Sequence, residues 1–137
     1  MITIRDVADL VGVPYLMGGR DPAVGMDCWA LVREVMQRAG RPVNVDWHPS
    51  SDERATREAI ALIKKETSSP TWYPVDWQPW AVVLMGSPHT VHHAGVSLPD
   101  TTVLHAGIGH GSVREAWVAV KRQYGRVQCY RSIEWDK

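Results

Sequence analysis

The chain has 137 residues, a length that fits one hydrophobic core, and we expect a single domain over residues 1–137. Its 15 basic and 15 acidic residues give a formal net charge of zero, which argues against a nucleic-acid footprint. Because no apolar run could span a bilayer and the N-terminus lacks the shape of a signal peptide, we expect no membrane insertion and synthesis in a cytoplasm.

The N-terminal segment is predicted to be a short helix followed by a loop. Thr3 and Asp6 have the spacing of a capping box, in which each residue caps the other's backbone at a helix start. We therefore expect a helix over residues 3–11, ended by Gly12. Residues 12–25 are rich in glycine and proline, which indicates a structured loop.

Cys28 lies at the start of a strongly amphipathic helix. Apolar residues recur at the spacing of one helix face from Cys28 to about Ala39, Asp27 is a natural N-cap, and Gly40 follows the helix end. A cysteine in the first helical turn experiences the positive end of the macrodipole, so we predict a lowered thiol pKa and a reactive thiolate. The alternatives are an inert buried cysteine and a disulfide to Cys129, which would consume the thiol.

The middle of the chain carries a second helical pattern and a run of aromatic residues. Residues 41–50 are expected to form a loop, and a capping-box spacing that begins at Ser50 opens a predicted helix over about 51–66. Residues 67–80 read as a wrapped surface loop and a candidate groove wall, or else as a flap of the core. That stretch contains Trp72, Trp77 and Trp80.

The second half of the chain changes to short apolar runs. Residues 81–86, 92–98 and 102–106 are predicted strands of an antiparallel sheet, with a turn at Pro99–Asp100 between the last two. Residues 126–133 are a further predicted strand.

A third helix is predicted between these strands. Ser112 and Glu115 have capping-box spacing, and an apolar stripe continues through Trp117 and Val120 to Tyr124. Helices followed by a meander of strands favour an α+β fold.

Two histidines in neighbouring predicted strands could assist Cys28. A cysteine nucleophile needs a base and a group that orients the base. His93 and His105 are twelve residues apart, and a three-residue turn would pair Gly95 with His105, so that His93 becomes the diagonal neighbour of His105. The alternatives are two structurally satisfied histidines, or a zinc site. Its possible ligands would be His89, His92, His93, His105, His110 and Cys28, although no HExxH or paired CxxC spacing is present.

Four segments taken together resemble the NlpC-type cell-wall peptidases, a papain-like cysteine hydrolase family. The segments are GVPYLMGG, GMDCWAL, HHAGVSL and VLHA, and the resemblance covers roughly residues 11–40 and 90–107. It implies a papain-like α+β fold, in which N-terminal helices, with the nucleophile at a helix N-terminus, pack on a small antiparallel sheet. It also implies a cysteine peptidase with Cys28 as nucleophile, His93 as general base and His105 as the orienting residue, without cofactor or metal.

The resemblance also bears on substrate binding. Tyr15 matches a family tyrosine near the cysteine that helps to hold substrate or the oxyanion, and Asp27 and Trp29 are further candidates on this side of the site. The family usually has Ser-Gly after the cysteine, whereas this chain has Trp29 and Ala30. Because that serine belongs to the substrate-binding wall, the departure puts stem-peptide specificity in question.

The implied activity is cleavage of amide bonds in peptidoglycan stem peptides. The Cys-Trp pair resembles stand-alone family members in phage tails, which implies a tail-tip protein that contacts other tail-tip proteins and opens the host wall from the periplasm. Two alternatives stay open. One is a structural tail component or plug with a vestigial site, and the other is an amidase or acyltransferase on the same fold.

Overall fold

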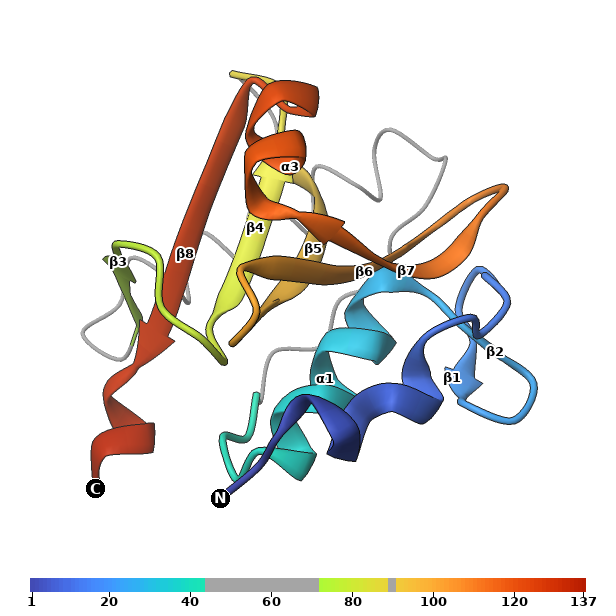
Figure 1. The fold of residues 1–137 in the computed structure, drawn as a ribbon, viewed down its shortest axis with the longest axis horizontal. Coiled ribbons are helices and arrows are strands. Elements are labelled where there is room, and N and C mark those ends of the chain that lie inside the picture. The colour runs from blue at the N-terminus through green and yellow to red at the C-terminus, as the bar shows by residue number, and fades with distance from the viewer. Residues whose placement is uncertain (44–71, 89–90) are drawn as a thin grey trace.

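The computed structural model describes residues 1–43, 72–88 and 91–137, and it is an α+β fold (Figure 1). Two helices in the N-terminal third, η1 (Ile4–Leu10) and α1 (Cys28–Arg38), lie against a six-stranded antiparallel sheet. A third, α3 (Trp117–Gln123), packs on β6, β7 and β8. The expected fold class is therefore confirmed. The predicted helix over 51–66 and most of the predicted loop over 41–50 lie outside the described residues.

The sheet has the strand order β3-β8-β4-β5-β6-β7, and each pair of neighbours is antiparallel. The four strands predicted over 81–86, 92–98, 102–106 and 126–133 are confirmed with small shifts at their ends, and β3 and β7 are additional. The bounds are β3 (Trp72–Val75), β4 (Val82–Gly86), β5 (Val91–Leu98), β6 (Thr102–Gly107), β7 (Gly111–Ala116) and β8 (Arg126–Ser132). The centre of the sheet is thus formed by β4 and β5, which are the most apolar segments of the second half.

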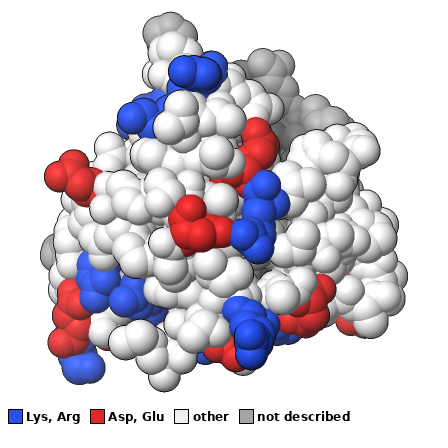
Figure 2. Space-filling model, in the orientation of Figure 1, with Lys and Arg blue, Asp and Glu red and all other residues white. Residues whose placement is uncertain are grey.

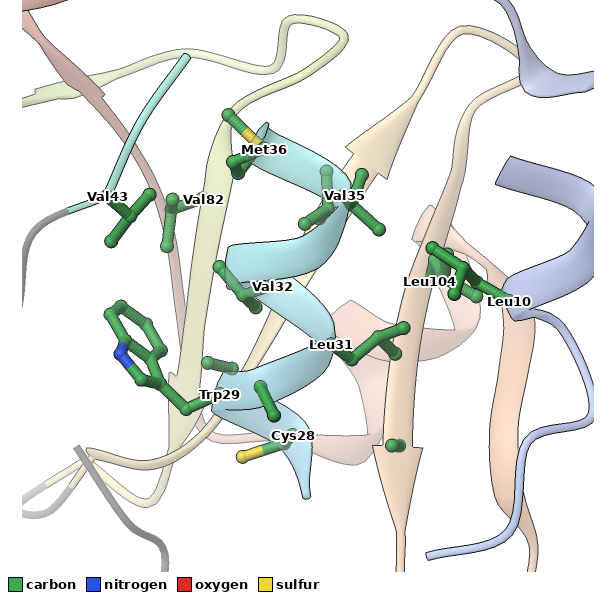
Figure 3. Packing of buried hydrophobic residues seen from close by; sticks show 14 of the residues in the cluster. Leu10, Cys28, Trp29, Leu31, Val32, Val35, Met36, Val43, Val82 and Leu104 are labelled. Carbon is green, nitrogen blue, oxygen red and sulfur yellow. The ribbon is translucent and has the colours of Figure 1, made fainter. Parts of the chain in front are cut away.

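Helix α1 fills one face of the sheet (Figure 3). Its apolar stripe is the one the sequence predicts, and Leu31, Val32 and Val35 are fully buried against residues of β4, β5 and β6. Burial of such side chains contributes about 1.5–3 kcal/mol each. The helix ends as expected, because Gly40 adopts a positive φ of 69° directly after the C-cap. This packing fixes the position of the first turn of α1.

The other face of the sheet is covered by α3. Alternate residues of β4 divide between the two faces, since Val82 and Leu84 contact the α1 cluster whereas Val83 and Met85 belong to the second cluster with Val120 of α3. Both faces of the central strands are therefore buried. At the molecular surface, acidic and basic side chains are interspersed over the face drawn in Figure 2, consistent with the zero net charge.

The predicted helical start at residues 112–115 is wrong, because this segment is strand β7 and the helix begins only at Trp117. The Ser112 hydroxyl donates to the carbonyl of Leu10, 2.5 Å away, and accepts from the backbone N–H of Val13 at 2.7 Å. These long-range bonds attach the end of η1 to the sheet. They replace the local capping bond that the S-x-x-E spacing suggested.

Three smaller predictions also need correction. The first helix is a 3₁₀ helix of seven residues, although Thr3 and Asp6 do form the expected pair, with the Thr3 N–H donating to Asp6 at 2.8 Å. The loop over 12–25 contains a two-stranded ribbon formed by β1 (Arg20–Asp21) and β2 (Gly25–Met26). Within 67–80 the structure has strand β3 rather than only a surface loop.

Of the tryptophans of that segment, Trp72 and Trp80 are buried and Trp77 is half-buried, and Trp80 also lines a cavity of about 950 Å³. Trp72 is buried and meets Trp135 edge to face, with ring centroids 5.3 Å apart. Trp77 packs on Trp117 at 4.8 Å, and Trp80 is buried. Aromatic pairs of this kind stabilise the fold beyond the area they bury.

Candidate active site

Cys28 is the first residue of α1, and its thiol is almost fully buried, with 1% of the residue exposed (Figure 3). Asp27 is the N-cap predicted from the sequence. Its Oδ1 accepts a hydrogen bond of 2.8 Å from the N–H of Ala30, which satisfies one of the free donors at the helix start. The carboxylate of Asp27 is itself buried, so its place in the fold is that of a helix cap beneath the thiol.

The thiol lies where two strands of the sheet separate. The ladder between β5 and β6 ends at the pair Gly95–His105, although β5 extends back to Val91 and β6 continues to Gly107. The sulfur of Cys28 interacts with the backbone N–H of Ala94, at the first position beyond that last pair. Gly95 permits the close approach at the pair itself, since a Cβ there would lie 2.8 Å from the carbonyl oxygen of Leu104.

His93 and His105 meet beside this opening. The predicted hairpin register is confirmed, because Gly95 pairs with His105 and Leu98 with Thr102. The two imidazoles are diagonal neighbours, with His93 Nε2 2.7 Å from His105 Nδ1 and the ring planes at 79°. His93 is half-buried and follows directly on the chain from the exposed His92. The structure thus places Cys28, His93 and His105 around one end of the β5–β6 ladder.

Two further residues that the sequence reasoning missed adjoin the histidine pair. Glu115 of β7 accepts from His105 Nε2 at 2.8 Å, and Tyr124, which follows α3, stacks on His93 with ring centroids 5.8 Å apart. A signal for Glu115 was present in the sequence. The glycine-rich stretch Gly107–Gly111 indicates a hairpin between β6 and β7. In that hairpin Glu115 pairs with Val103, which precedes His105 by two residues, so Glu115 is the diagonal neighbour of His105.

Burial determines the protonation of the thiol and the base. Burial raises the pKa of Cys28 to about 12, against weaker opposing contributions from the N–H groups of Ala94, Cys28 and Trp29. The predicted lowering of this pKa is therefore wrong, because removing the thiolate from water outweighs the helix terminus. Burial, followed by the neighbouring histidines, lowers the pKa of His93 to about 3. The resting pair is thus a neutral thiol and a neutral imidazole.

The lowered pKa of His93 predicts a loss of stability in mild acid. In the unfolded chain this histidine binds a proton near its ordinary pKa of 6.5, whereas the folded form does so only near 3. The unfolded state therefore holds more protons between these values, and the free energy of unfolding falls as the pH is lowered from 6.5. His105 acts in the same direction, because burial lowers its pKa too. Melting temperatures between pH 4.5 and 6.5 measure this, in a range above most carboxylate titration.

A single variant separates the contribution of His93 to this pH dependence from the contributions of all other groups that bind protons in mild acid. His93→Gln keeps a polar side chain of similar size but cannot bind a proton in this range. Its melting temperature should therefore depend less steeply on pH between 4.5 and 6.5 than that of the wild type. Equal slopes in the two proteins would contradict the buried, uncharged state of His93.

The remaining predicted site residues, Tyr15 and Trp29, differ in how they lie relative to the thiol. Tyr15 is half-buried, and burial, with Cys28 and Asp27 nearby, raises the pKa of its hydroxyl. It lines a cavity of about 310 Å³ beneath the turn that carries His110. The side chain of Trp29 is only 2% exposed and packs in the α1 cluster, so only its backbone N–H faces the thiol.

Of the possible zinc ligands, His89 lies outside the described residues. Within residues 1–43, 72–88 and 91–137, no three His, Cys, Asp or Glu side chains are arranged to hold a metal ion. His110 does approach His105, with ring centroids 5.9 Å apart, but its Nδ1 bonds to the carbonyl of Gly111 at 2.8 Å. Cys28 and Cys129 are both free. No helix in the described part of the chain is long and apolar enough to cross a membrane.

Comparison with known proteins identifies relatives of this arrangement. The model of the NlpC/P60 family matches residues 12–127. The crystal structure of the NlpC/p60 domain of the peptidoglycan hydrolase SagA superposes with a TM-score of 0.56 at 20% identity, covering 92% of this chain and 93% of that one. An NLP/P60-family protein from Staphylococcus aureus, described as similar to lipoprotein, gives 0.57 at 17% identity and covers 91% of this chain. The match spans 39% of that longer protein. A search of curated protein sequences finds no match.

Proposed function

The chain belongs to the NlpC/P60 family, and from this membership we propose that it is a peptidoglycan hydrolase, a cysteine endopeptidase that cleaves amide bonds of the stem peptide. One observation carries the proposal. A buried thiol at a helix start lies against the N–H of Ala94, next to a histidine that is hydrogen-bonded at 2.7 Å to a second histidine. Nucleophile, base and orienting group are the three parts that covalent catalysis by a thiol requires.

The proposed reaction has two stages. As Cys28 Sγ attacks the amide carbonyl, its proton passes to His93, and the resulting imidazolium protonates the leaving amine when the C–N bond breaks. Water then hydrolyses the thioester, with His93 as base, and the carboxylic acid and free thiol are released. In this proposal His93 acts as the general base in the first stage and as the general acid when the amine leaves.

The negative charge that develops on the carbonyl oxygen needs hydrogen-bond donors. The backbone N–H of Cys28 at the start of α1 is the proposed donor, aided by the positive end of the helix. Tyr15 is the proposed second contact, since its hydroxyl lies close enough to Cys28 for the thiol to affect its pKa. Trp29 and Asp27 act in this proposal through the packing and capping of α1.

The test is digestion of purified peptidoglycan followed by mass spectrometry of the soluble products. An endopeptidase releases fragments with a new α-amine and a new carboxylate, whereas an acyltransferase would attach an added amine to the new acyl end. An amidase that cuts between the sugar and the stem would release intact stems. No soluble fragments from a folded protein would favour a structural role with a vestigial site.

The proposed setting is the tail tip of a phage particle, where the chain would contact other tail-tip proteins and open the host wall locally. This part rests on the Cys28-Trp29 pair in the sequence and on analogy with stand-alone family members. Mass spectrometry of purified particles from a phage that encodes the chain tests it, since a tail component must be present in the particle.

A further inference from the structure

Glu115 is the last member of a continuous hydrogen-bonded chain that begins at the proposed base. His93 Nε2 lies 2.7 Å from His105 Nδ1, and His105 Nε2 lies 2.8 Å from Glu115 Oε1. The three residues come from three successive strands, β5, β6 and β7. His105 is 1% exposed, so its ring has no access to water and must use these protein partners.

We propose that Glu115 is a positioning residue that fixes the proton positions on both imidazoles. This inference rests on the proposed function, since it assigns a role within the same site. An ionised carboxylate can only accept a hydrogen bond, so His105 Nε2 must carry a proton and donate it to Glu115. In a neutral ring the other nitrogen, Nδ1, then carries a lone pair.

The proton position on His105 in turn determines the proton position on His93, the proposed base. His105 Nδ1 accepts, so His93 Nε2 must donate, and the lone pair of a neutral His93 is confined to Nδ1. That is the nitrogen that does not face His105 and is therefore the one that can take the thiol proton. Without the carboxylate, His105 can carry its proton on Nδ1, and His93 would then turn its lone pair toward His105 instead of Cys28.

The other groups around the pair do not replace Glu115. His110 packs against the ring of His105, but its Nδ1 is bonded to the Gly111 carbonyl. Tyr124 stacks on His93 and so restrains the plane of the ring, not the position of its proton. His92 points to the exposed side, and its ring centroid is 6.1 Å from that of Tyr124. Only Glu115 is hydrogen-bonded to His105 Nε2 among the residues described.

The experiment compares three single substitutions in a Cys129→Ser background, which leaves Cys28 as the one cysteine. Glu115→Leu removes the acceptor, and Glu115→Gln retains an acceptor oxygen without the charge. Glu34→Gln is the matched control, because its side chain is 30% exposed, against 33% for Glu115, and bonds to Arg38 on the outer side of α1. The readouts are the alkylation rate of Cys28 by iodoacetamide at pH 7 and the imidazole tautomers, measured by long-range proton–nitrogen NMR.

In the parent protein both His93 and His105 should appear as Nε2–H tautomers. Glu115→Leu should shift the tautomers and slow alkylation about tenfold or more, in line with the loss seen when an orienting acid is removed. Glu115→Gln should be intermediate, and Glu34→Gln unchanged. For hydrolysis we expect a fall in kcat with KM unchanged.

The inference is overturned if Glu115→Leu keeps both tautomers, or if its alkylation rate stays within about twofold of the parent. Should Glu115→Leu fail to fold, Glu115→Gln decides the question by the same two readouts. Because alkylation does not depend on the substrate, failure of the proposed function can be told apart from failure of this inference. If the parent protein releases no peptidoglycan fragments but Glu115→Leu still slows alkylation of Cys28, the proposed function fails and the positioning role of Glu115 stands.

Discussion

Replacing Cys28 with alanine is expected to abolish the release of peptidoglycan fragments, with a loss of about 10⁴-fold or more in rate. The thiol is the group that would form the covalent intermediate, and the remaining oxyanion contacts cannot substitute for it. The fold should persist, because the change removes a single sulfur atom from a helix whose cap and apolar face are untouched. Fragment release and the melting temperature measure the two effects together.

The matched control for this substitution is Cys129→Ala. Cys129 is also a free, buried cysteine, but it lies in β8 within the cluster on the other face of the sheet. The same chemical change there should leave the rate of fragment release unchanged. Retention of a tenth or more of the activity by Cys28→Ala would remove Cys28 from its proposed role.

Replacing His93 with alanine is expected to lower the hydrolysis rate by about 10²–10⁴-fold, the usual contribution of a general base. The resting thiol has a pKa of about 12, so very little thiolate exists at neutral pH without a base to take the proton. In the same Cys129→Ser background, His93→Ala should also lower the rate of Cys28 alkylation at pH 7. Alkylation should rise as the pH is raised through the alkaline range.

His92→Ala is the control, because it removes an imidazole from the adjacent position of the same strand on the exposed side. It should change neither hydrolysis nor alkylation. If the two alanine variants behave alike, His93 is not the base, and the short contact with His105 has only a structural role.

Much of the site could be predicted from the sequence because it depends on local periodicity. The helix face from Cys28 onward and the cap at Asp27 are properties of neighbouring residues, and both appear as expected. The meeting of His93 with His105 was predictable because the length of one turn sets the register of a hairpin. Each of these features is determined within about a dozen residues of sequence.

The parts that could not be predicted depend on contacts between distant segments. The S-x-x-E spacing at Ser112 is compatible with a helix cap, but bonds to Leu10 and Val13, about a hundred residues away, select the strand. That choice is what brings Glu115 to His105. The raised pKa of Cys28 likewise comes from burial by the assembled sheet, which no local pattern reveals.

The separation of β5 from β6 has a consequence for local stability along a single strand. Gly95 and Val96 of β5 are paired with β4 on one side and with β6 on the other, whereas among the described strands Val91, His93 and Ala94 are paired with β4 alone. Backbone segments with fewer partners open at a lower free energy than the global unfolding transition. We therefore expect exposure of the buried sulfur to begin with a local fluctuation at the less protected end of β5, which includes His93, while the pairs from Gly95 to Leu98 hold β6 and His105 in place.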